Sequence, residues 1–122
     1  MIDRLFELVN ADAALVRRGR FLTTDFLVEV GDETFHVSVQ EGRIAAVTRG
    51  PAPGHAWTFA IRASAEAWRE FWQPVPRAGY NDLFALTRFG RARIEGDLLP
   101  LMANLRYVKE VLETPRRLAR SG

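Results

Sequence analysis

Residues 24–47 read TDFLVEVGDETFHVSVQEGRIAAV, a stretch in which apolar and polar side chains alternate. A period of two is typical of strands that bury one face. The pairs Gly31-Asp32 and Glu41-Gly42 divide the stretch into three runs, and glycine-bearing pairs favour the tight turns of hairpins. The stretch therefore predicts a three-stranded antiparallel meander. The side chains expected to face the core are Phe26, Val28, Val30, Phe35, Val37, Val39, Ile44 and Ala46.

The residues before the meander predict a helix over residues 3–18. Apolar positions recur there at intervals of three and four, and Arg17 and Arg18 precede Gly19, a residue that commonly ends helices. The apolar stripe consists of Ile2, Leu5, Phe6, Val9, Ala13 and Val16.

Two further strands are predicted after the meander. Residues 51–54, Pro-Ala-Pro-Gly, interrupt the pattern, and alternation resumes over residues 57–62 as a fourth strand. A short fifth strand is predicted at residues 91–95, where Gly96 then permits a sharp turn. The inward side chains of the fourth strand are expected to be Trp57, Phe59 and Ile61.

Three helices are predicted around these strands. Ser64 is expected to cap a short helix that carries Trp68, and Asn81 is expected to cap a second one that ends at Gly90. Asp97 is placed to cap a final helix, whose apolar face indicates one continuous element running to Thr114-Pro115.

Composition and length indicate one folded domain. A chain of 122 residues with 48% hydrophobic and 26% charged residues has enough apolar surface to build a core. We therefore expect an α+β domain over residues 1–115, with a five-stranded, mainly antiparallel sheet covered by helices. Residues 116–122 are expected to form a basic tail, with disorder as an open alternative.

Charge and apolar runs exclude several classes of protein. The formal net charge is only +2, too small to favour nucleic acid as a partner. The sequence has no cysteine and no run of eighteen apolar residues, and its start does not resemble a secretory signal. We expect a cytoplasmic protein without a transmembrane segment or a disulfide.

The sequence contains none of the common motifs that bind a metal or a cofactor. His36 and His55 have no second histidine or cysteine at ligand spacing, and His36 is expected on the solvent face of its strand. The glycine pattern of a dinucleotide loop, the phosphate-loop lysine and the serine turn of hydrolases are also missing. We predict no metal, no cofactor and no enzymatic activity.

A few polar residues lie at junctions where catalytic groups often gather. Glu95 and Asp97 form one such pair, and Tyr80, Asn81 and Asp82 follow a loop rich in proline and glycine. Helix capping and turn formation explain most of them, so we assign no catalytic residue. A small enzyme using Tyr80, Asp82 or Glu95 stays as an alternative.

Aromatic residues concentrate between Trp57 and Phe89, a segment that contains all three tryptophans. Such a concentration fits two arrangements. The sheet and helices can leave a cavity for an apolar ligand, or these side chains can fill the core completely. Spacing alone leaves both arrangements open.

The order of predicted elements resembles the sterol carrier protein type-two domain, a family of non-specific lipid-transfer proteins. The resemblance rests on residues 15–20 (LVRRGR), residues 57–62 (WTFAIR) leading to Trp68, and residues 82–86 (DLFAL). It is strongest at residues 90–97 (GRARIEGD), which are similar to that family's strand and Gly-Asp turn before its closing helix.

This resemblance implies a tunnel between sheet and helices that holds a lipid, acyl chain or sterol. Carried onto this sequence, the implied lining is Trp68, Phe71, Trp72, Phe84, Leu98, Leu101, Met102 and Leu105. Arg91 and Arg93, expected on one face of the fifth strand, are candidates for an anionic head group. The tryptophans and the loop at residues 74–79 depart from the family pattern, so bulky side chains there can close the tunnel or select a smaller ligand.

Sequence reasoning thus favours non-catalytic binding or transfer of an apolar, lipid-like small molecule. The alternative is an interaction module with a packed core, whose exposed apolar patch pairs with another protein or with a second copy in a homodimer.

Overall fold

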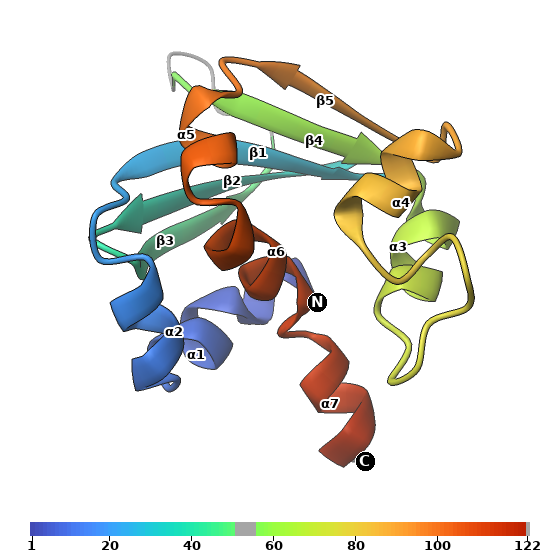
Figure 1. Cartoon of the computed structure of the whole chain (residues 1–122), viewed down its shortest axis with the longest axis horizontal. Coiled ribbons are helices and arrows are strands. Elements are labelled where there is room, and N and C mark those ends of the chain that lie inside the picture. Colours follow the sequence, from blue (N-terminus) through green and yellow to red (C-terminus); the bar gives the residue numbers. More distant parts are fainter. Residues whose placement is uncertain (51–55, 122) are drawn as a thin grey trace.

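The computed structural model of the protein describes residues 1–50 and 56–121, with side chains described as far as Leu118. The predictions for His55 and for the break at residues 51–54 lie outside these residues. The described chain forms a five-stranded mixed sheet in the order β3-β2-β1-β4-β5, with the helices gathered on one side (Figure 1). This confirms the predicted α+β class. The strands are β1 (Thr24–Val30), β2 (Glu33–Gln40), β3 (Arg43–Arg49), β4 (Phe59–Ala63) and β5 (Ala92–Gly96).

The predicted meander is confirmed, including both of its turns. Strands β1, β2 and β3 pair antiparallel, and Gly31 and Gly42 adopt φ values of 61° and 83°, which side-chain-free glycine tolerates. Ala46 was expected inward, but the pairing shifts between Ser38 and Val39, so Ala46 lies opposite Ser38 on the outer face. This irregularity is a β-bulge, which changes the alternation.

Strand β4 pairs parallel to β1 and antiparallel to β5, a layout that local pattern does not encode. Phe26 of β1 lies opposite Phe59 of β4, and their rings stack with centroids 5.0 Å apart. The strand begins at Phe59, so Trp57 precedes it and is partly exposed, contrary to the sequence prediction.

His36 lies on the outer sheet face, as expected, but it is not solvent-exposed. Its Nε2 atom is 3.3 Å from the Ala56 carbonyl oxygen, and only 8% of the residue is accessible. Ala56 therefore lies against a side chain that alternation alone assigns to solvent.

The amino-terminal helix predicted over residues 3–18 is broken. Asp12 has extended backbone angles, and its carboxylate accepts a hydrogen bond from the Leu15 amide at 3.1 Å, so a new helix starts there. Gly19 ends it, as predicted. Phe6 is half exposed and does not belong to the buried stripe. The pieces are η1 (Ile2–Arg4), α1 (Leu5–Asn10) and α2 (Ala13–Arg18).

Helix α3 (Ala65–Phe71) begins as predicted, while α4 (Leu83–Arg88) begins one residue later than expected. Ser64 Oγ accepts a hydrogen bond from the Ala67 amide at 3.0 Å. Asp82, not Asn81, caps α4 through its bond from the Phe84 amide at 2.7 Å. An aspartate carboxylate is as good a cap as the asparagine amide, so sequence alone does not choose between neighbours.

We expect Ser64→Ala to lower the free energy of unfolding by about 1 kcal/mol, because the Ala67 amide loses its acceptor. Urea denaturation of both proteins measures the difference. Ser64→Asp retains a capping oxygen and is expected to unfold close to the parent; an alanine variant as stable as the parent would contradict the capping role.

The predicted continuous closing helix divides at Asn104 into α5 (Leu99–Ala103) and α6 (Leu105–Glu113). Asp97 Oδ1 accepts a bond from the Leu99 amide, but the N-cap residue of α5 is Leu98, not Asp97 as the sequence predicted. Asn104 donates its side-chain amide to the Pro100 carbonyl at 3.1 Å and has non-helical backbone angles, so the helix changes direction there.

The basic segment after residue 115 forms helix α7 (Arg116–Ser121) rather than a tail without regular structure. Arg116 is buried, and its guanidinium donates to the carbonyl oxygens of Phe71 at 2.7 Å and Asn81 at 2.9 Å. Buried carbonyl acceptors satisfy the charge, which explains why this arginine packs inside.

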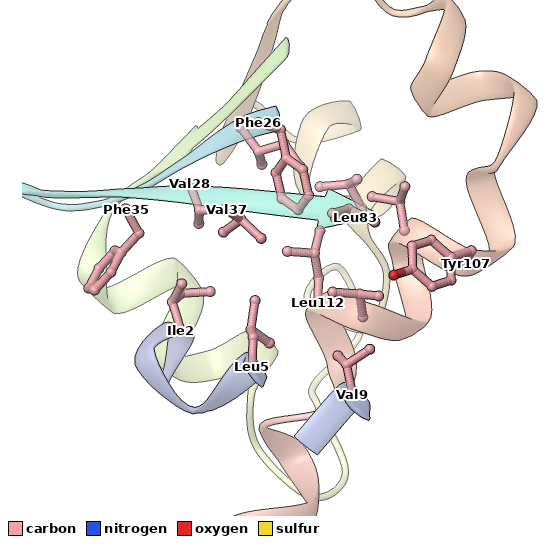
Figure 2. Packing of buried hydrophobic residues seen from close by; sticks show 14 of the residues in the cluster. Ile2, Leu5, Val9, Phe26, Val28, Phe35, Val37, Leu83, Tyr107 and Leu112 are labelled. Atoms are coloured by element: carbon pink, nitrogen blue, oxygen red, sulfur yellow. The ribbon is translucent and has the colours of Figure 1, made fainter. Parts of the chain in front are cut away.

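The core lies between the sheet and the helices. Figure 2 shows Ile2, Leu5 and Val9 of the amino-terminal helices pointing toward Val28 and Val37 of the sheet. Each of these five residues is essentially inaccessible to solvent. The amino-terminal helices therefore pack against the inner face of the meander, and Asn10 is hydrogen-bonded to the backbone of Ile44 in the edge strand β3.

Tyr107 fastens α6 to the opposite end of the same core. Its hydroxyl donates a 2.6 Å hydrogen bond to the Gly42 carbonyl oxygen in the β2–β3 turn. Burial raises the pKa of Tyr107 above its usual value, so the phenol stays neutral and keeps the proton that it donates.

Candidate ligand-binding site

A pocket of about 350 Å³ opens where the amino terminus, one end of the meander and α3 meet. In Figure 1 this is the region between the N label, the adjoining ends of β1 to β3 and α3. A small-molecule site typically measures about 300–1,000 Å³, so the pocket is at the small end of that range. It is lined by Met1, Ile2, Val30, Glu33, Phe35, Arg49, Ala65, Arg69, Trp72 and Gln73.

The inner wall of the pocket is apolar. Ile2 comes from η1, and Val30 and Phe35 come from β1 and β2 on either side of their turn. Trp72 follows α3, and its Nε1–H donates to the Leu112 carbonyl oxygen at 2.9 Å. That bond satisfies the polar atom of the indole, so the ring can present an apolar surface to the pocket.

The rim of the pocket is polar. Arg49 lies opposite Phe35 in the β2–β3 ladder, and its guanidinium carbon is 5.3 Å from the centre of that ring. Arg69 lies one turn after Ala65 on the face of α3 that lines the pocket. Glu33 and Gln73 complete the polar wall. The site thus combines an apolar inner wall with charged groups at its opening.

A hollow of about 330 Å³ beside Glu29, Arg62 and Arg93 has a predominantly charged lining, as do two hollows beside α6. One of about 370 Å³ lies between Asp82 and α6, and includes Leu105 together with Lys109 and Glu113. A smaller one of about 190 Å³ lies beside Arg116 and Arg117. Burial raises the pKa of Glu113, although Arg116 holds its carboxylate by a 2.6 Å ion pair. These hollows are poorly suited to an apolar ligand.

Four of the eight residues predicted to line a ligand tunnel lie in the packed core. Trp68, Phe71 and Leu101 expose 1% of their surface or less, and Trp72 exposes 7% at the floor of the pocket. Trp68 also donates its indole N–H to the Glu29 carbonyl oxygen at 2.8 Å. Contact between a ligand and the first three would require the helices to separate, so their lining role stays a prediction.

The other four residues of the predicted lining lie nearer the surface. Leu98 and Met102 are 40% and 54% exposed at α5, while Phe84 of α4 and Leu105 of α6 are partly buried. The Lys109 ammonium lies 5.2 Å from the centre of the Phe84 ring. The predicted set is thus divided between core and surface, and Trp72 alone among the eight lines the apolar pocket.

The arginines predicted to bind a head group point to different places. Arg91 precedes β5, and its guanidinium lies 4.4 Å from the centre of the Tyr80 ring. Arg93 lies opposite Arg62 on the outer sheet face and donates to Glu95 at 2.7 Å. The expectation that Arg91 and Arg93 share a strand face is wrong, because the strand starts at Ala92.

The carboxylates considered as catalytic have structural partners. Asp82 caps α4 and pairs with Lys109 at 2.5 Å, and Asp97 accepts from the Leu99 amide. The hydrogen bond from Arg93 is the largest of the causes that lower the pKa of Glu95, so this group stays ionised. A general acid needs the opposite shift. Within residues 1–50 and 56–121, no three histidine, cysteine, aspartate or glutamate residues form a group that would hold a metal ion.

Sequence reasoning missed most of the pocket. Val30 and Phe35 were assigned to the core, and Arg49 and Arg69 received no role. The alternation of Val47 with Arg49 at the end of the third strand was a usable signal, because it places a charge at an inward position. No local pattern brings η1 and α3 to the same end of the sheet.

The sequence matches no protein-family model and no curated protein. The structure, in contrast, matches solved structures over nearly its whole length. A crystal structure of sterol carrier protein 2 superposes with a TM-score of 0.74 at 14% sequence identity, covering 94% of this chain and 92% of the other. The chain has the sterol carrier protein 2 fold.

Other structures with the sterol carrier protein 2 fold agree. The apo form of sterol carrier protein 2 from Yarrowia lipolytica matches with a TM-score of 0.58 and 10% identity, covering 94% of this chain and 86% of the other. The UbiJ-SCP2 ubiquinone synthesis protein also gives 0.58, at 19% identity, with 99% and 89% covered. At such low sequence identities the structural matches establish the fold alone, so the functional site must be inferred from the residues of this chain.

The sterol carrier protein 2 fold of this chain contains only short helices. Within residues 1–50 and 56–121, none is long and apolar enough to span a bilayer.

Proposed function

We propose that the protein binds an apolar, lipid-like molecule in the pocket between η1, β2 and α3, and carries it without converting it chemically. The observation behind the proposal is an apolar pocket of about 350 Å³ in a chain with the sterol carrier protein 2 fold. Several proteins of this fold are named sterol carriers, which supports a carrier role, and we propose that it acts in the cytoplasm.

The size of the pocket favours a single apolar chain or a small ring system over a lipid with two acyl chains. Ile2, Val30, Phe35 and Trp72 supply the apolar wall, and covering it releases about 25 cal/mol for each Å² removed from water. Micromolar binding corresponds to about 8 kcal/mol, and association costs about 4 kcal/mol or more, so roughly 500 Å² or more of apolar ligand and wall surface must leave water.

Filling the pocket is expected to weaken ligand binding about tenfold or more. Ala65 is the first residue of α3 and lines the pocket, so phenylalanine in Ala65→Phe occupies space that a ligand needs. Displacement of a fluorescent fatty alcohol measures binding, with native mass spectrometry to count bound molecules. Ubiquinone belongs among the competitors, because one structure of this fold is titled a ubiquinone synthesis protein.

Ala13→Phe is the matched control, since Ala13 is the exposed first residue of α2 after another capped start. It is expected to bind like the parent. The proposal fails if the parent takes up no sterol, quinone, fatty acid or fatty alcohol, or if Ala65→Phe binds as tightly as the parent. Homodimer formation stays a prediction that light scattering can test.

A further inference from the structure

Arg49 is an arginine on the inward face of a sheet. The ladder places it opposite Phe35, which in turn lies opposite the buried Val28, so all three project from the helix-covered face. Arg49 remains exposed because the pocket opens at this end of β3. Its charge therefore lies at the polar rim of a pocket whose inner wall is apolar.

Arg69 approaches the same opening from the helix layer. Residues 65, 69, 72 and 73 line the pocket and follow helical spacing, so they present one side of α3 and its end. Trp72 is the buried member of this set and Arg69 is an exposed one. Two guanidinium groups, one from the sheet and one from α3, thus border a single pocket.

Within the described part of the chain, Arg49 and Arg69 form no ion pair, whereas Arg62 on the outer face is held by Glu29 at 2.5 Å and by Glu95 at 3.0 Å. Their donors are therefore available to a ligand. An arginine fork binds carboxylate or phosphate oxygens in pairs, and a neighbouring apolar surface strengthens such a contact by excluding water.

Acidic groups near the pocket leave it with an excess of positive charge. Glu33 is the carboxylate of the wall, against two arginines. The main cause of the lowered pKa of Asp3 is the hydrogen bond that Asp3 accepts from the Met1 amino group at 2.7 Å. The charge of Arg49 lowers this pKa slightly further. That carboxylate is already satisfied.

We infer that the ligand is a small amphipathic anion, whose carboxylate or phosphate lies between Arg49 and Arg69 and whose apolar body lies against Phe35 and Trp72. The inference rests on the proposed function and specifies its ligand class. A purely structural role for Arg49 is protection of the edge strand β3 from pairing with other chains, since inward charges serve that purpose. If Arg49 binds the ligand, its replacement lowers the affinity for anionic ligands; if it only protects the sheet edge, that affinity stays the same.

The experiment compares three ligands that share one alkyl chain: dodecanol, dodecanoate and dodecyl phosphate, each below its micellar concentration. The intact chain is titrated with each ligand by displacement of a neutral fluorescent alcohol. Dodecanoate, dodecyl phosphate or both are expected to bind about tenfold tighter than dodecanol or better, as charge-assisted hydrogen bonds imply. The comparison of the two anions tells a carboxylate ligand from a phosphate ligand.

Arg49→Gln and Arg69→Gln are expected to reduce this preference for anions about tenfold while leaving dodecanol binding unchanged. Arg91→Gln and Arg93→Gln are the controls, because both arginines lie away from the pocket. They are expected to keep the parent's preference. Far-UV circular dichroism verifies that each variant is folded.

Each outcome decides between the two claims. If none of the three ligands binds, the proposed function fails and the inference fails with it. If dodecanol binds as tightly as both anions, the pocket is an apolar site and the inference alone is wrong. It is also wrong if the anion preference survives in Arg49→Gln and Arg69→Gln, which would leave Arg49 as a guard of the sheet edge.

Discussion

Trp68→Ala is expected to lower the free energy of unfolding by about 3–5 kcal/mol. The indole is fully inaccessible, stacks on Trp72 with ring centroids 5.1 Å apart, and meets Phe71 edge-on at 5.3 Å. Alanine leaves a large cavity there, and the Glu29 carbonyl oxygen loses the indole N–H. Urea denaturation measures the loss, which is a large share of the roughly 5–15 kcal/mol that stabilises a typical domain.

The matched control is Phe21→Ala, because Phe21 is 84% exposed and the Arg20 guanidinium lies 4.5 Å from the centre of its ring. It is expected to change stability by about 0.5 kcal/mol or less. One other result for Trp68→Ala would support the ligand tunnel that the sequence predicts. That result is near-parental stability combined with loss of lipid binding, which would show that the indole serves a ligand and not the core.

Gly42→Ala is expected to destabilise the protein by about 3 kcal/mol or more, because two costs coincide. Gly42 has φ of 83°, a conformation that L-residues with a side chain adopt at a cost. A Cβ atom there would also lie 2.3 Å from the Val16 carbonyl oxygen and 2.7 Å from the Gly19 carbonyl carbon. Those are backbone atoms, so α2 and the following turn would have to move.

Gly90→Ala separates the two costs. Gly90 has a comparable φ of 72°, but a Cβ atom there would meet nothing within 4 Å. Its loss of stability is expected to be about 1–2 kcal/mol, the conformational cost alone. Thermal unfolding followed by circular dichroism ranks the two variants. Equal losses would mean that the close contact between the β2–β3 turn and α2 does not constrain the fold.

Elements that depend on neighbouring residues were predicted well. The Gly31 and Gly42 turns and the Ser64 cap follow from interactions within a few residues, so their sequence signals are sufficient. Gly19 belongs to the same class.

Elements that depend on distant contacts were predicted poorly. Asp12 and Asn104 lie within apolar patterns that indicate continuous helices, yet both interrupt them. Whether a polar side chain in such a pattern breaks the helix depends on how the two halves pack, because capping compensates only part of the lost backbone bonds. Arg116 was likewise assigned to a tail, since its acceptors, the Phe71 and Asn81 carbonyls, are far away in sequence.

Local sequence pattern is enough to predict the order of strands and helices, the meander and the concentration of aromatic residues, because these follow from alternation, helical spacing and turn chemistry. The parallel pairing of β1 with β4, the complete burial of Trp68 and the presence of Arg49 and Arg69 at one pocket become visible in the folded structure alone. The reason is that pocket walls come from η1, β2, β3 and α3, whose relative positions are set by packing across the whole core and by no interaction between sequence neighbours.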